Sequence, residues 1–512
     1  MANQNGKADL KPGPAPASLG AGGAPAAGSN TAPFLPYHDL RQWLEEAKKL
    51  GEVKEVSGLS YQQDIGMVAE MSSHSDDSPC FVFKDVPGTL EGSRLLINVF
   101  GGKRKNMTLG FSTELSKLEL SESFRVNHAA MTKRIPPKFV ETGPVMQNVM
   151  IGDAIDVTRF PAPQWHPQDG GRYIGTGCYN ILRDPDDGWI NCGTYRVMIH
   201  DANTLGFYIS PGKHGRVMRD KYRSRGERMP VAIVCGGDPM SFLMGSSEVP
   251  FGVSEFEVIG GMRGQPVEVI KGPVTGLPIP ANAEIVIEGF VEPGNERVEG
   301  PFGEWTGYYA SDLRPEPVID VKAVYHRNEP ILLGCVPQRP PDEICRYRAI
   351  VRSALLRENI EKAGVPGITA AWAHEVGNTR LFLAVAVKQR YPGHAKQAGH
   401  MASQCHVGAY CGRYVIVVDD DIDVSNLEEV IWALITRSDP ATSIDIIRGA
   451  WSTPLDPRIE PERRAVGDFT NSRAVIDACR PYHWRDKFPA VNMPSSEERR
   501  IALEKFGHLM KL

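Results

Sequence analysis

Residues 283–304 read AEIVIEGFVEPGNERVEGPFGE, and this stretch contains the two patterns on which the predicted fold and site depend. In its first part, residues 284–291 alternate polar and apolar side chains, which is the period of a half-buried strand. In its last part, Glu299 and Glu304 stand five positions apart around a Gly-Pro-Phe-Gly segment. Proline and glycine prevent a regular helix there, so both glutamates are expected on a bent, rigid loop.

An amide and a guanidinium lie upstream of these acids, as Asn191 and Arg196, which are also five positions apart. Two acids and one arginine can form a site in which one carboxylate stays ionised against the guanidinium while the other carries a proton. The same side chains can equally form an ion-pair network that is only structural, and spacing leaves both interpretations open.

Short β-rich runs between Gly and Pro clusters fill the middle of the chain. They are 195–199, 231–235, 267–270, 283–291, 318–325 and 331–336. Such runs indicate a barrel or sandwich of antiparallel strands. The first hundred residues are expected to form a smaller α/β unit, with helices at 38–51 and 63–71 and strands at 81–83 and 95–99.

The pair Pro340-Pro341 marks a boundary. Pro341 is expected to open a long helix that runs to about Ala363, ends at Gly364 and bridges two domains. Strands and helices then alternate, which indicates an α/β layer with a largely parallel sheet. Its last helix is expected to begin with the capping box Ser425-Asn426-Leu427-Glu428.

Composition limits the class of protein. A chain of 512 residues is expected to form two or three domains. A net charge of −5 without a basic cluster argues against nucleic acid, and no apolar run is long enough for a membrane helix. Nine cysteines, an odd number without a CxxC pair, indicate reduced thiols and a cytoplasmic protein. Residues 1–32, rich in Ala, Pro, Gly and Ser, are expected to be disordered.

Four further patterns have alternative interpretations. Asn191, His214 and Glu255 offer an O/N/O donor set for Mn²⁺ or Mg²⁺, with His200 beside Asp201 as a competitor. The stretch 165–171, WHPQDGG, is either functional or a turn with structural polar contacts. Residues 419–421, three aspartates, are interpreted as a solvated loop rather than a metal site. The partial GxGxxG at 175–180 lacks its third glycine and only weakly suggests a dinucleotide site.

Taken in order, several motifs resemble the UbiD family of reversible (de)carboxylases. They are WHPQDGGRYIGTG, NCGTYRVMIHD, PGKHGRV, SSEVPFGVSE, EGPFGEWTGY and VVDDDIDVSNLEEVIWALITR. The resemblance implies prenylated FMN made by a separate flavin prenyltransferase, a divalent metal (Mn²⁺, or Mg²⁺ or Fe²⁺) and K⁺. It also implies a flavin-binding domain with a split β-barrel (33–338), a linking helix (339–364) and a C-terminal α/β oligomerisation domain (365–512). A homodimer or homohexamer is expected.

Site residues follow from the same resemblance, position by position. Asn191, His214 and Glu255 match the metal ligands, and Arg196, Glu299 and Glu304 match the catalytic Glu-Arg-Glu network. Glu304 is then the general acid, and Arg196, held by Glu299, orients the substrate carboxylate. Further residues are expected to bind the cofactor; Ser246 and Ser247 line its phosphate and K⁺ region, and the others are Thr194, Tyr195 and Lys213.

Two positions, Trp305 and Lys213, differ from the ferulic acid decarboxylases of this family, and a third, Leu455, resembles a position in the pocket wall. They favour an aromatic or heteroaromatic acid over a cinnamic acid. An aryl-CoA carboxylate, physiological carboxylation, a metal-dependent hydrolase and a non-enzymatic flavin-binding subunit stay open as alternatives.

Overall fold

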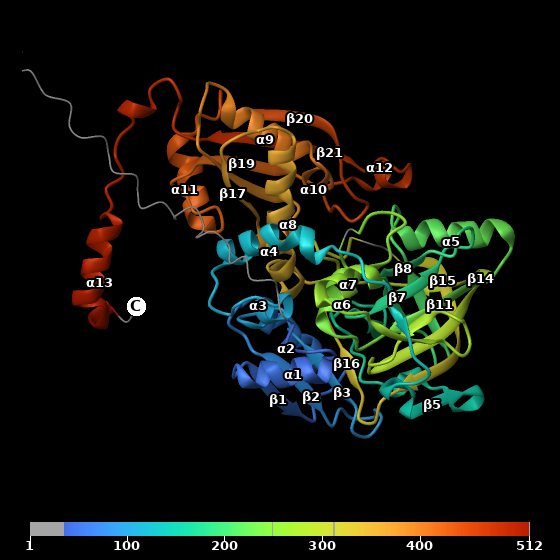
Figure 1. The fold of residues 1–512 in the computed structure, drawn as a ribbon. Coiled ribbons are helices and arrows are strands. Elements are labelled where there is room, and N and C mark those ends of the chain that lie inside the picture. Colours follow the sequence, from blue (N-terminus) through green and yellow to red (C-terminus); the bar gives the residue numbers. More distant parts are fainter. Residues whose placement is uncertain (1–34, 248, 311–312, 511–512) are drawn as a thin grey trace, which may run out of the picture.

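The computed structural model describes residues 35–247, 249–310 and 313–510, so the tail predicted at 1–32 lies outside the described residues. The fold is mixed α+β, with four sheets (Figure 1). Three sheets are built from residues before Pro340 and the fourth from residues after it.

The first sheet has the strand order β1-β2-β3-β16. Its strands are β1 (Val53–Ser57), β2 (Cys80–Lys84), β3 (Arg94–Ile97) and β16 (Ile331–Leu333). The nearby helices are α1 (Leu40–Lys49), α2 (Asp64–Ser73), α3 (Arg104–Leu109) and α4 (Lys117–Met131). The predicted first helix is confirmed but shorter, because the Asp39 carboxylate caps it by accepting the Gln42 backbone N–H at 2.8 Å.

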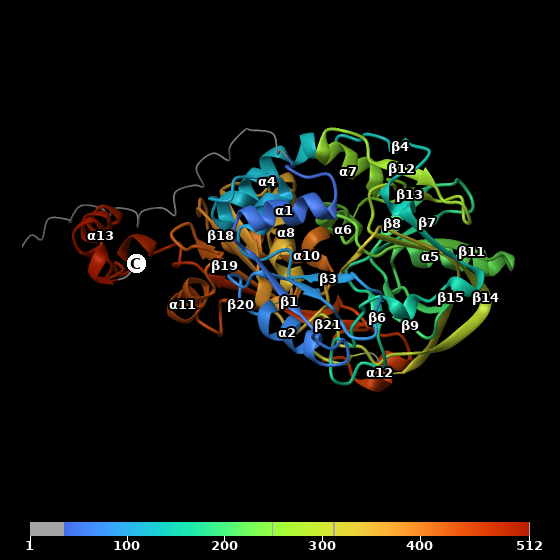
Figure 2. The same ribbon diagram turned by 90° about the horizontal axis from the view of Figure 1, so that it is seen from below.

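The largest sheet has nine strands, and all its pairings are antiparallel, as predicted. Two of the six predicted runs, 267–270 and 331–336, instead contribute strands to other sheets, because their pairing partners lie there. It follows the open path β6-β9-β10-β15-β14-β11-β7-β8, with β5 on β15. Its strands are β5 (Asn148–Ile151), β6 (Tyr173–Gly175), β7 (Tyr179–Arg183), β8 (Ile190–Gly193), β9 (Arg196–Ile199), β10 (Thr204–Tyr208), β11 (Met229–Val234), β14 (Ile285–Glu299) and β15 (Arg314–His326). The sheet curls, with α5 (His214–Arg225) beside it (Figure 2). A three-stranded sheet of β4 (Lys138–Phe139), β12 (Glu268–Lys271) and β13 (Pro278–Pro280) lies near α6 (Pro239–Gly245) and α7 (Glu255–Arg263).

Strand β14 corrects one prediction about the site. It was expected to end at residue 291 but continues, past a register shift, to Glu299, which pairs with Arg314 of β15. Residues 296–299 pair with β15, and this pairing keeps the chain extended beyond the Pro-Gly turn at 293–294. Glu299 therefore lies at the end of a strand, and only Glu304 lies on the following loop.

The fourth sheet has the order β17-β18-β19-β21-β20. Its strands are β17 (Ile368–Ala373), β18 (Phe382–Val387), β19 (Tyr414–Asp419), β20 (Ile444–Trp451) and β21 (Thr470–Ala478). The helices of this half are α8 (Glu343–Lys362), α9 (His394–Gln404), α10 (His406–Ala409), α11 (Leu427–Arg437), α12 (Pro461–Ala465) and α13 (Ser496–Met510). The sheet is parallel only in its centre, because β17 and β20 pair antiparallel at its edges; the largely parallel prediction is therefore corrected.

Two local predictions in this half are wrong. The cap of α11 is Asn426, whose side chain accepts the N–H groups of Glu428 and Glu429, so the helix begins one residue later than the capping box implied. The three aspartates at 419–421 are not simply a solvated loop. Asp419 and Asp421 both pair with the buried Arg437, at 3.1 and 2.8 Å, because the returning helix α11 brings that guanidinium over the strand end.

Helix α8 packs against α4 on one side and β17 on the other. One apolar core continues from α1 through α6 and α8 to the fourth sheet, and it includes Trp43, Tyr347 and Trp372. A second apolar core fills the curled sheet.

The nine cysteines are free thiols, and eight of them are buried. No helix in the described part of the chain is long and apolar enough to cross a membrane.

We expect His374, after β17, to make this half acid-sensitive. It is 2% exposed and stacks on Phe382, and burial lowers its pKa to about 4 despite the nearby Glu375. A histidine in the unfolded chain titrates near 6.5, so the folded state favours the neutral ring relative to the unfolded state. The free energy of unfolding that depends on this difference is fully present above about pH 6.5. It is lost as pH falls towards 4, by up to roughly 3 kcal/mol. Melting temperatures of wild type and His374→Gln between pH 7.5 and 4.5 test this. The variant should lose less stability than wild type on acidification, and parallel curves would contradict the assignment.

Candidate active site

Arg196 joins Glu299 and Glu304 in one buried network. Its Nε and Nη2 donate to the two carboxylate oxygens of Glu299 at 2.8 and 2.7 Å, and its Nη1 donates to Glu304 Oε1 at 2.6 Å. The guanidinium comes from the start of β9, and the acids come from the end of β14 and the loop after it. The structure thus brings together three side chains that are 103 and 108 positions apart in sequence.

Aromatic rings surround this guanidinium. The ring centroids of Tyr208, Phe302 and Tyr173 lie 4.5, 4.8 and 5.9 Å from the Arg196 guanidinium carbon. Such rings exclude water and attract the cation through their faces. Tyr208 lay outside every quoted motif, and its position follows from strand pairing rather than from spacing. Tyr173 and Phe302 stood within quoted motifs, but the sequence did not indicate their contact with Arg196.

The network holds one cation and two acids. Burial raises the pKa of Glu304, and Glu299 adds to the rise, against the lowering effect of Arg196. Glu299 meets Arg196 through both of its carboxylate oxygens, which is a bidentate, charge-assisted pairing. The arrangement can therefore hold one carboxylate against the cation while the other, Glu304, carries a proton.

Asp169 fixes the loop that carries Glu304. Its buried carboxylate accepts the Gly303 backbone N–H at 3.0 Å and the His166 N–H at 2.9 Å. The His166 ring contacts Asp169 through Nδ1 and the Pro337 carbonyl through Nε2, both at 3.0 Å. A Cβ on Gly170 would lie 1.8 Å from the Gly300 carbonyl oxygen. The turn at Gly170 can therefore pack against the acid loop only because Gly170 has no side chain. The WHPQDGG stretch is a support for the acid loop.

We expect Asp169→Asn to lower kcat by about 10- to 100-fold, because an amide cannot accept all these N–H groups and the Glu304 loop loses its position. KM should change little, since Asp169 touches only the loop and its support. Steady-state kinetics test this, with Asn at the exposed Asp153 as the matched control. Unchanged kcat in Asp169→Asn would show that the loop holds its position without this contact.

Residues after Pro340 also hold the acid loop. The Trp305 carbonyl accepts from Asn378 Nδ2 at 3.2 Å, and Thr306 Oγ1 donates to the Leu455 carbonyl at 3.5 Å. The guanidinium of Arg380 lies 5.2 Å from the Trp305 ring centroid. The predicted pocket residues Trp305 and Leu455 therefore lie close together, where the two halves of the chain meet.

Two of the three predicted metal ligands are in contact, and the third lies next in sequence to a residue that shares their Tyr195 partner. Asn191 Nδ2 donates to Glu255 Oε1 at 2.9 Å, and Asn191 Oδ1 accepts from the Tyr195 hydroxyl at 2.8 Å. His214 opens α5 next to Gly215, whose N–H donates to the same hydroxyl at 3.0 Å. The competitor His200 lies at the other end of β9, in the turn before β10.

These residues fit a divalent cation. Glu255 is 3% exposed, burial raises its pKa to about 7, and it forms no ion pair with a described cationic side chain. A cation would supply that charge, and amide oxygen, imidazole and carboxylate are suitable ligands. Residues 35–247, 249–310 and 313–510 contain no cluster of three or more His, Cys, Asp or Glu suited to a metal. The trio has only two such residues, and the amide of Asn191 completes it.

The remaining predicted cofactor residues lie around the end of α6. Ser246 and Ser247 hydroxyls donate to the Leu243 carbonyl at 2.9 and 2.7 Å, and the Thr194 N–H donates to the Gly245 carbonyl at 3.0 Å. Ser246 also contacts the hydroxyl of Tyr347, a residue that the sequence did not single out. Lys213 is the N-cap residue of α5, directly before His214.

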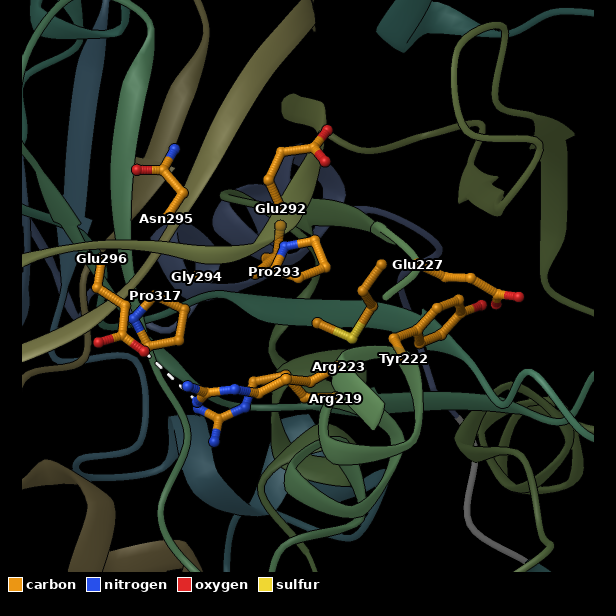
Figure 3. A pocket seen from close by; sticks show the side chains of 12 residues that line it. Arg219, Tyr222, Arg223, Glu227, Glu292, Pro293, Gly294, Asn295, Glu296 and Pro317 are labelled. Atoms are coloured by element: carbon orange, nitrogen blue, oxygen red, sulfur yellow. Dashed lines mark ion pairs between the residues drawn. The ribbon is translucent and has the colours of Figure 1, made fainter. Parts of the chain in front are cut away.

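A separate hollow of about 20 Å³ lies where the end of α5 meets β14, with Arg223 paired to Glu296 at its rim (Figure 3). It is too small for an aromatic acid, and no predicted site residue lines it.

Two family models match the chain. The UbiD model, described as a 3-octaprenyl-4-hydroxybenzoate carboxy-lyase Rift-related domain, covers residues 138–340, and the UbiD_C model, the C-terminal domain of that carboxy-lyase, covers 346–478. The pyrrole-2-carboxylic acid decarboxylase of Pseudomonas aeruginosa is 30% identical over 484 residues, 90% of this chain and 96% of that protein.

Two solved structures are also similar. The UbiD-class enzyme HmfF from Pelotomaculum thermopropionicum in complex with FMN has a TM-score of 0.80 at 27% identity, covering 93% of this chain and 100% of that one. An evolved dimeric form of HmfF in complex with prFMN has a TM-score of 0.76 at 26% identity, covering 92% and 98%. Since both family domains occur in order and the likeness covers nearly the whole chain, the protein belongs to the UbiD family of decarboxylases.

Proposed function

We propose that this protein uses prenylated FMN for the reversible, non-oxidative decarboxylation of an aromatic or heteroaromatic acid. The Glu299–Arg196–Glu304 network carries this proposal. It supplies both a cation that can meet a carboxylate and an acid, Glu304, whose pKa is raised by burial, in a site lined by aromatic rings. The named activity of the Pseudomonas aeruginosa relative, on pyrrole-2-carboxylic acid, supports a small aromatic substrate.

Each residue of the network has a role. Arg196 orients the substrate carboxylate, and Glu299 holds Arg196 in place. Glu304 returns a proton to the ring carbon after CO₂ leaves. The rings of Tyr208 and Phe302 exclude water that would compete as a proton source.

The cofactor site is assigned to residues around β8, α5, α6 and α7. Asn191, His214 and Glu255 would hold Mn²⁺, or Mg²⁺ or Fe²⁺, at the flavin phosphate, and Ser246 and Ser247 would line the K⁺ region. Thr194, Tyr195 and Lys213 complete this set. When bound, the prenylated flavin supplies the electron sink that no side chain provides. A separate flavin prenyltransferase would make it.

The architecture that we propose has a flavin-binding domain with a split β-barrel (33–338), a linking helix (339–364) and a C-terminal oligomerisation domain (365–512). Helix α8 falls within the proposed linker. Large exposed apolar side chains on α11, β20 and α13 support self-association into a homodimer or homohexamer. They are Ile431, Trp432, Ile435, Ile446, Trp451, Leu503, Phe506 and Leu509.

The test is to co-produce the protein with a flavin prenyltransferase and Mn²⁺, record its absorbance spectrum and native mass, and screen aromatic acids for CO₂ release. We expect bound prenylated flavin and release of CO₂ from at least one aromatic or heteroaromatic acid. Activity only on a cinnamic acid or an aryl-CoA carboxylate would redirect the substrate assignment. Metal uptake without flavin would reject the decarboxylase and favour a metal-dependent hydrolase.

A further inference from the structure

Arg314 is a second arginine beside the Glu299–Arg196–Glu304 network. It opens β15, and the register of the sheet places it directly opposite Glu299 of β14. Directly opposed residues of an antiparallel pair have their side chains on the same face of the sheet. Arg196 of β9 lies opposite Tyr208 of β10 in the same way. Because β9, β10, β15 and β14 are consecutive in the sheet, these side chains come from four neighbouring strands.

The ring of Tyr208 joins the two arginines. The guanidinium carbon of Arg314 lies 4.4 Å from the centroid of this ring, and that of Arg196 lies 4.5 Å from it. Arg314 is itself held by the buried Glu316, two residues further along β15, whose carboxylate accepts from Arg314 Nε at 2.6 Å. An aromatic ring attracts a cation placed over its face. The position of the Tyr208 ring against Arg196 therefore depends on the Arg314–Glu316 pair.

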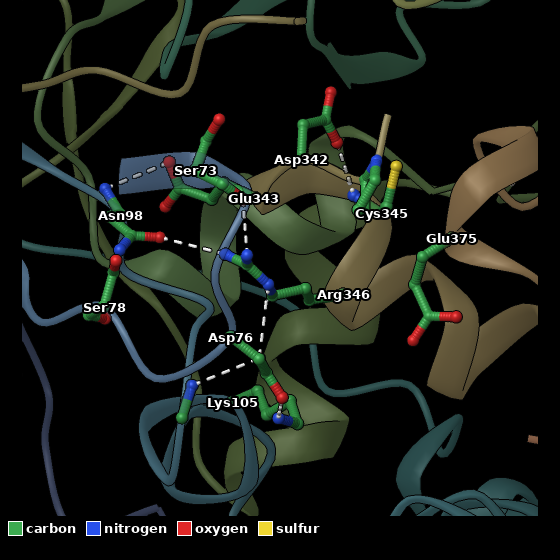
Figure 4. Close-up of polar contacts among 12 residues, drawn as sticks. Ser73, Asp76, Ser78, Asn98, Lys105, Asp342, Glu343, Cys345, Arg346 and Glu375 are labelled. Carbon is green, nitrogen blue, oxygen red and sulfur yellow. Dashed lines mark hydrogen bonds and ion pairs between the residues drawn. The ribbon is translucent and has the colours of Figure 1, made fainter. Parts of the chain in front are cut away.

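The arginine near the start of α8 gives a contrast. Arg346 pairs with Asp76 at 3.2 Å and donates to Asn98 at 3.2 Å (Figure 4). Asp76 and Asn98 belong to segments next to β2 and β3, so these contacts attach α8 to the first sheet. The partners of Arg314 are different in kind, because one of them is a ring that also contacts the central cation of the candidate active site.

The charge of Arg314 acts on Glu304. Burial raises the pKa of Glu304, and Glu299 adds to the rise, whereas Arg196 and Arg314 lower it. Further charged groups face this set from neighbouring elements: Glu316 on β15, Arg216 on α5 and, from the other half of the chain, Arg380 over the Trp305 ring and Arg464 at the Ala310 carbonyl. Two cations of the curled sheet therefore favour the ionised form of this acid.

Resting on the proposed function, we propose that Arg314 is a positioning residue for the proton donor Glu304. It holds the Tyr208 ring against Arg196, and its charge stabilises the carboxylate that Glu304 becomes. When the O–H bond of Glu304 breaks and the new C–H bond of the product forms, a negative charge is left on Glu304. Arg196 and Arg314 together meet that charge, so the proton is given up more readily than it would be beside Arg196 alone.

The experiment measures the protonation of Glu304 directly. Infrared difference spectra of the full-length protein, co-produced with a flavin prenyltransferase, are recorded as pH is raised, and the carboxylic C=O band that is missing in Glu304→Gln is assigned to Glu304. On the same samples kcat for pyrrole-2-carboxylate is measured against pH. The variants are Arg314→Gln and Arg314→Lys. The matched control is Lys322→Gln, which removes an exposed cation of the same strand that pairs with Asp320, two positions away, at 2.6 Å.

We expect the Glu304 band to disappear at higher pH in Arg314→Gln than in wild type, because one of the two cations is gone. The protonated acid is the active form, so the alkaline limb of kcat should move to higher pH with it. The plateau of kcat should fall by about 2- to 10-fold, because Tyr208 loses its support. Arg314→Lys keeps the charge without the planar stack, so it should combine the lower plateau with wild-type titration. Lys322→Gln should match wild type in both.

A purely structural role predicts lower rates in both Arg314 variants and an unchanged titration of Glu304, and that result would overturn the proposal. An equal shift of the titration in Arg314→Gln and Arg314→Lys would also overturn it, because charge would not be the cause. A wild-type plateau in Arg314→Lys would reject the stacking role even if Arg314→Gln does not fold. If the titration of Glu304 shifts as expected but no aromatic acid releases CO₂, the role of Arg314 stands and the proposed function fails.

Discussion

Replacement of Glu304 by glutamine is expected to lower the rate of decarboxylation by about 10³-fold or more, while flavin and metal stay bound. Glutamine has nearly the same shape and can still accept from Arg196 Nη1, which Glu304 contacts at 2.6 Å. It cannot deliver a carboxylic proton. Single-turnover release of CO₂, with the flavin spectrum recorded on the same sample, separates loss of chemistry from loss of cofactor.

The matched control for this change is Glu296→Gln, on an exposed part of the same strand β14. It should behave as wild type. A wild-type rate in Glu304→Gln would remove Glu304 from the role of proton donor. Loss of flavin in that variant would instead mean that the carboxyl group supports cofactor binding.

Replacement of Arg196 by lysine is expected to lower kcat/KM by about 10²- to 10³-fold. The two carboxylates are held through three nitrogens of one planar guanidinium, and an ammonium is a single point charge on a flexible stem. Both acids are buried, so imperfect pairing should also lower the melting temperature. Steady-state kinetics and thermal unfolding measure the two effects separately.

Lysine at the exposed Arg225, which pairs with Asp186 on the surface, is the control for this substitution. It should change neither property. A fall in melting temperature of Arg196→Lys with wild-type kinetics would assign the network a structural role, the alternative that spacing left open.

Local sequence patterns were sufficient for most single elements. The first helix follows from its apolar spacing, because this signal acts within one or two turns. Two boundaries moved for different reasons. Strand β14 continued past its turn residues because the distant strand β15 pairs with it. Helix α11 began one residue later because the Asn426 side chain accepts two nearby backbone N–H groups.

The composition of the site was also predictable, but its contacts were not. Spacing named Arg196, Glu299 and Glu304 as a possible set, and it could not distinguish a catalytic network from a structural one. The contacts of Tyr208 and Tyr173 with Arg196 could not be predicted from spacing, because the two rings come from neighbouring strands; only Tyr173 stood within a quoted motif. Asp169 was visible as part of a polar turn, yet its hydrogen bond to Gly303 spans 134 positions.

The sequence by itself determined the family, the ordered motifs and the set of acids, amide, imidazole and guanidinium available to the site. The tertiary structure decided which of these side chains meet. Arg196 contacts Glu299 and Glu304, although 103 and 108 positions separate them in the sequence. The physical reason is that ion pairing requires contact within a few ångströms, and contacts between distant residues are set by sheet register and helix packing rather than by local sequence.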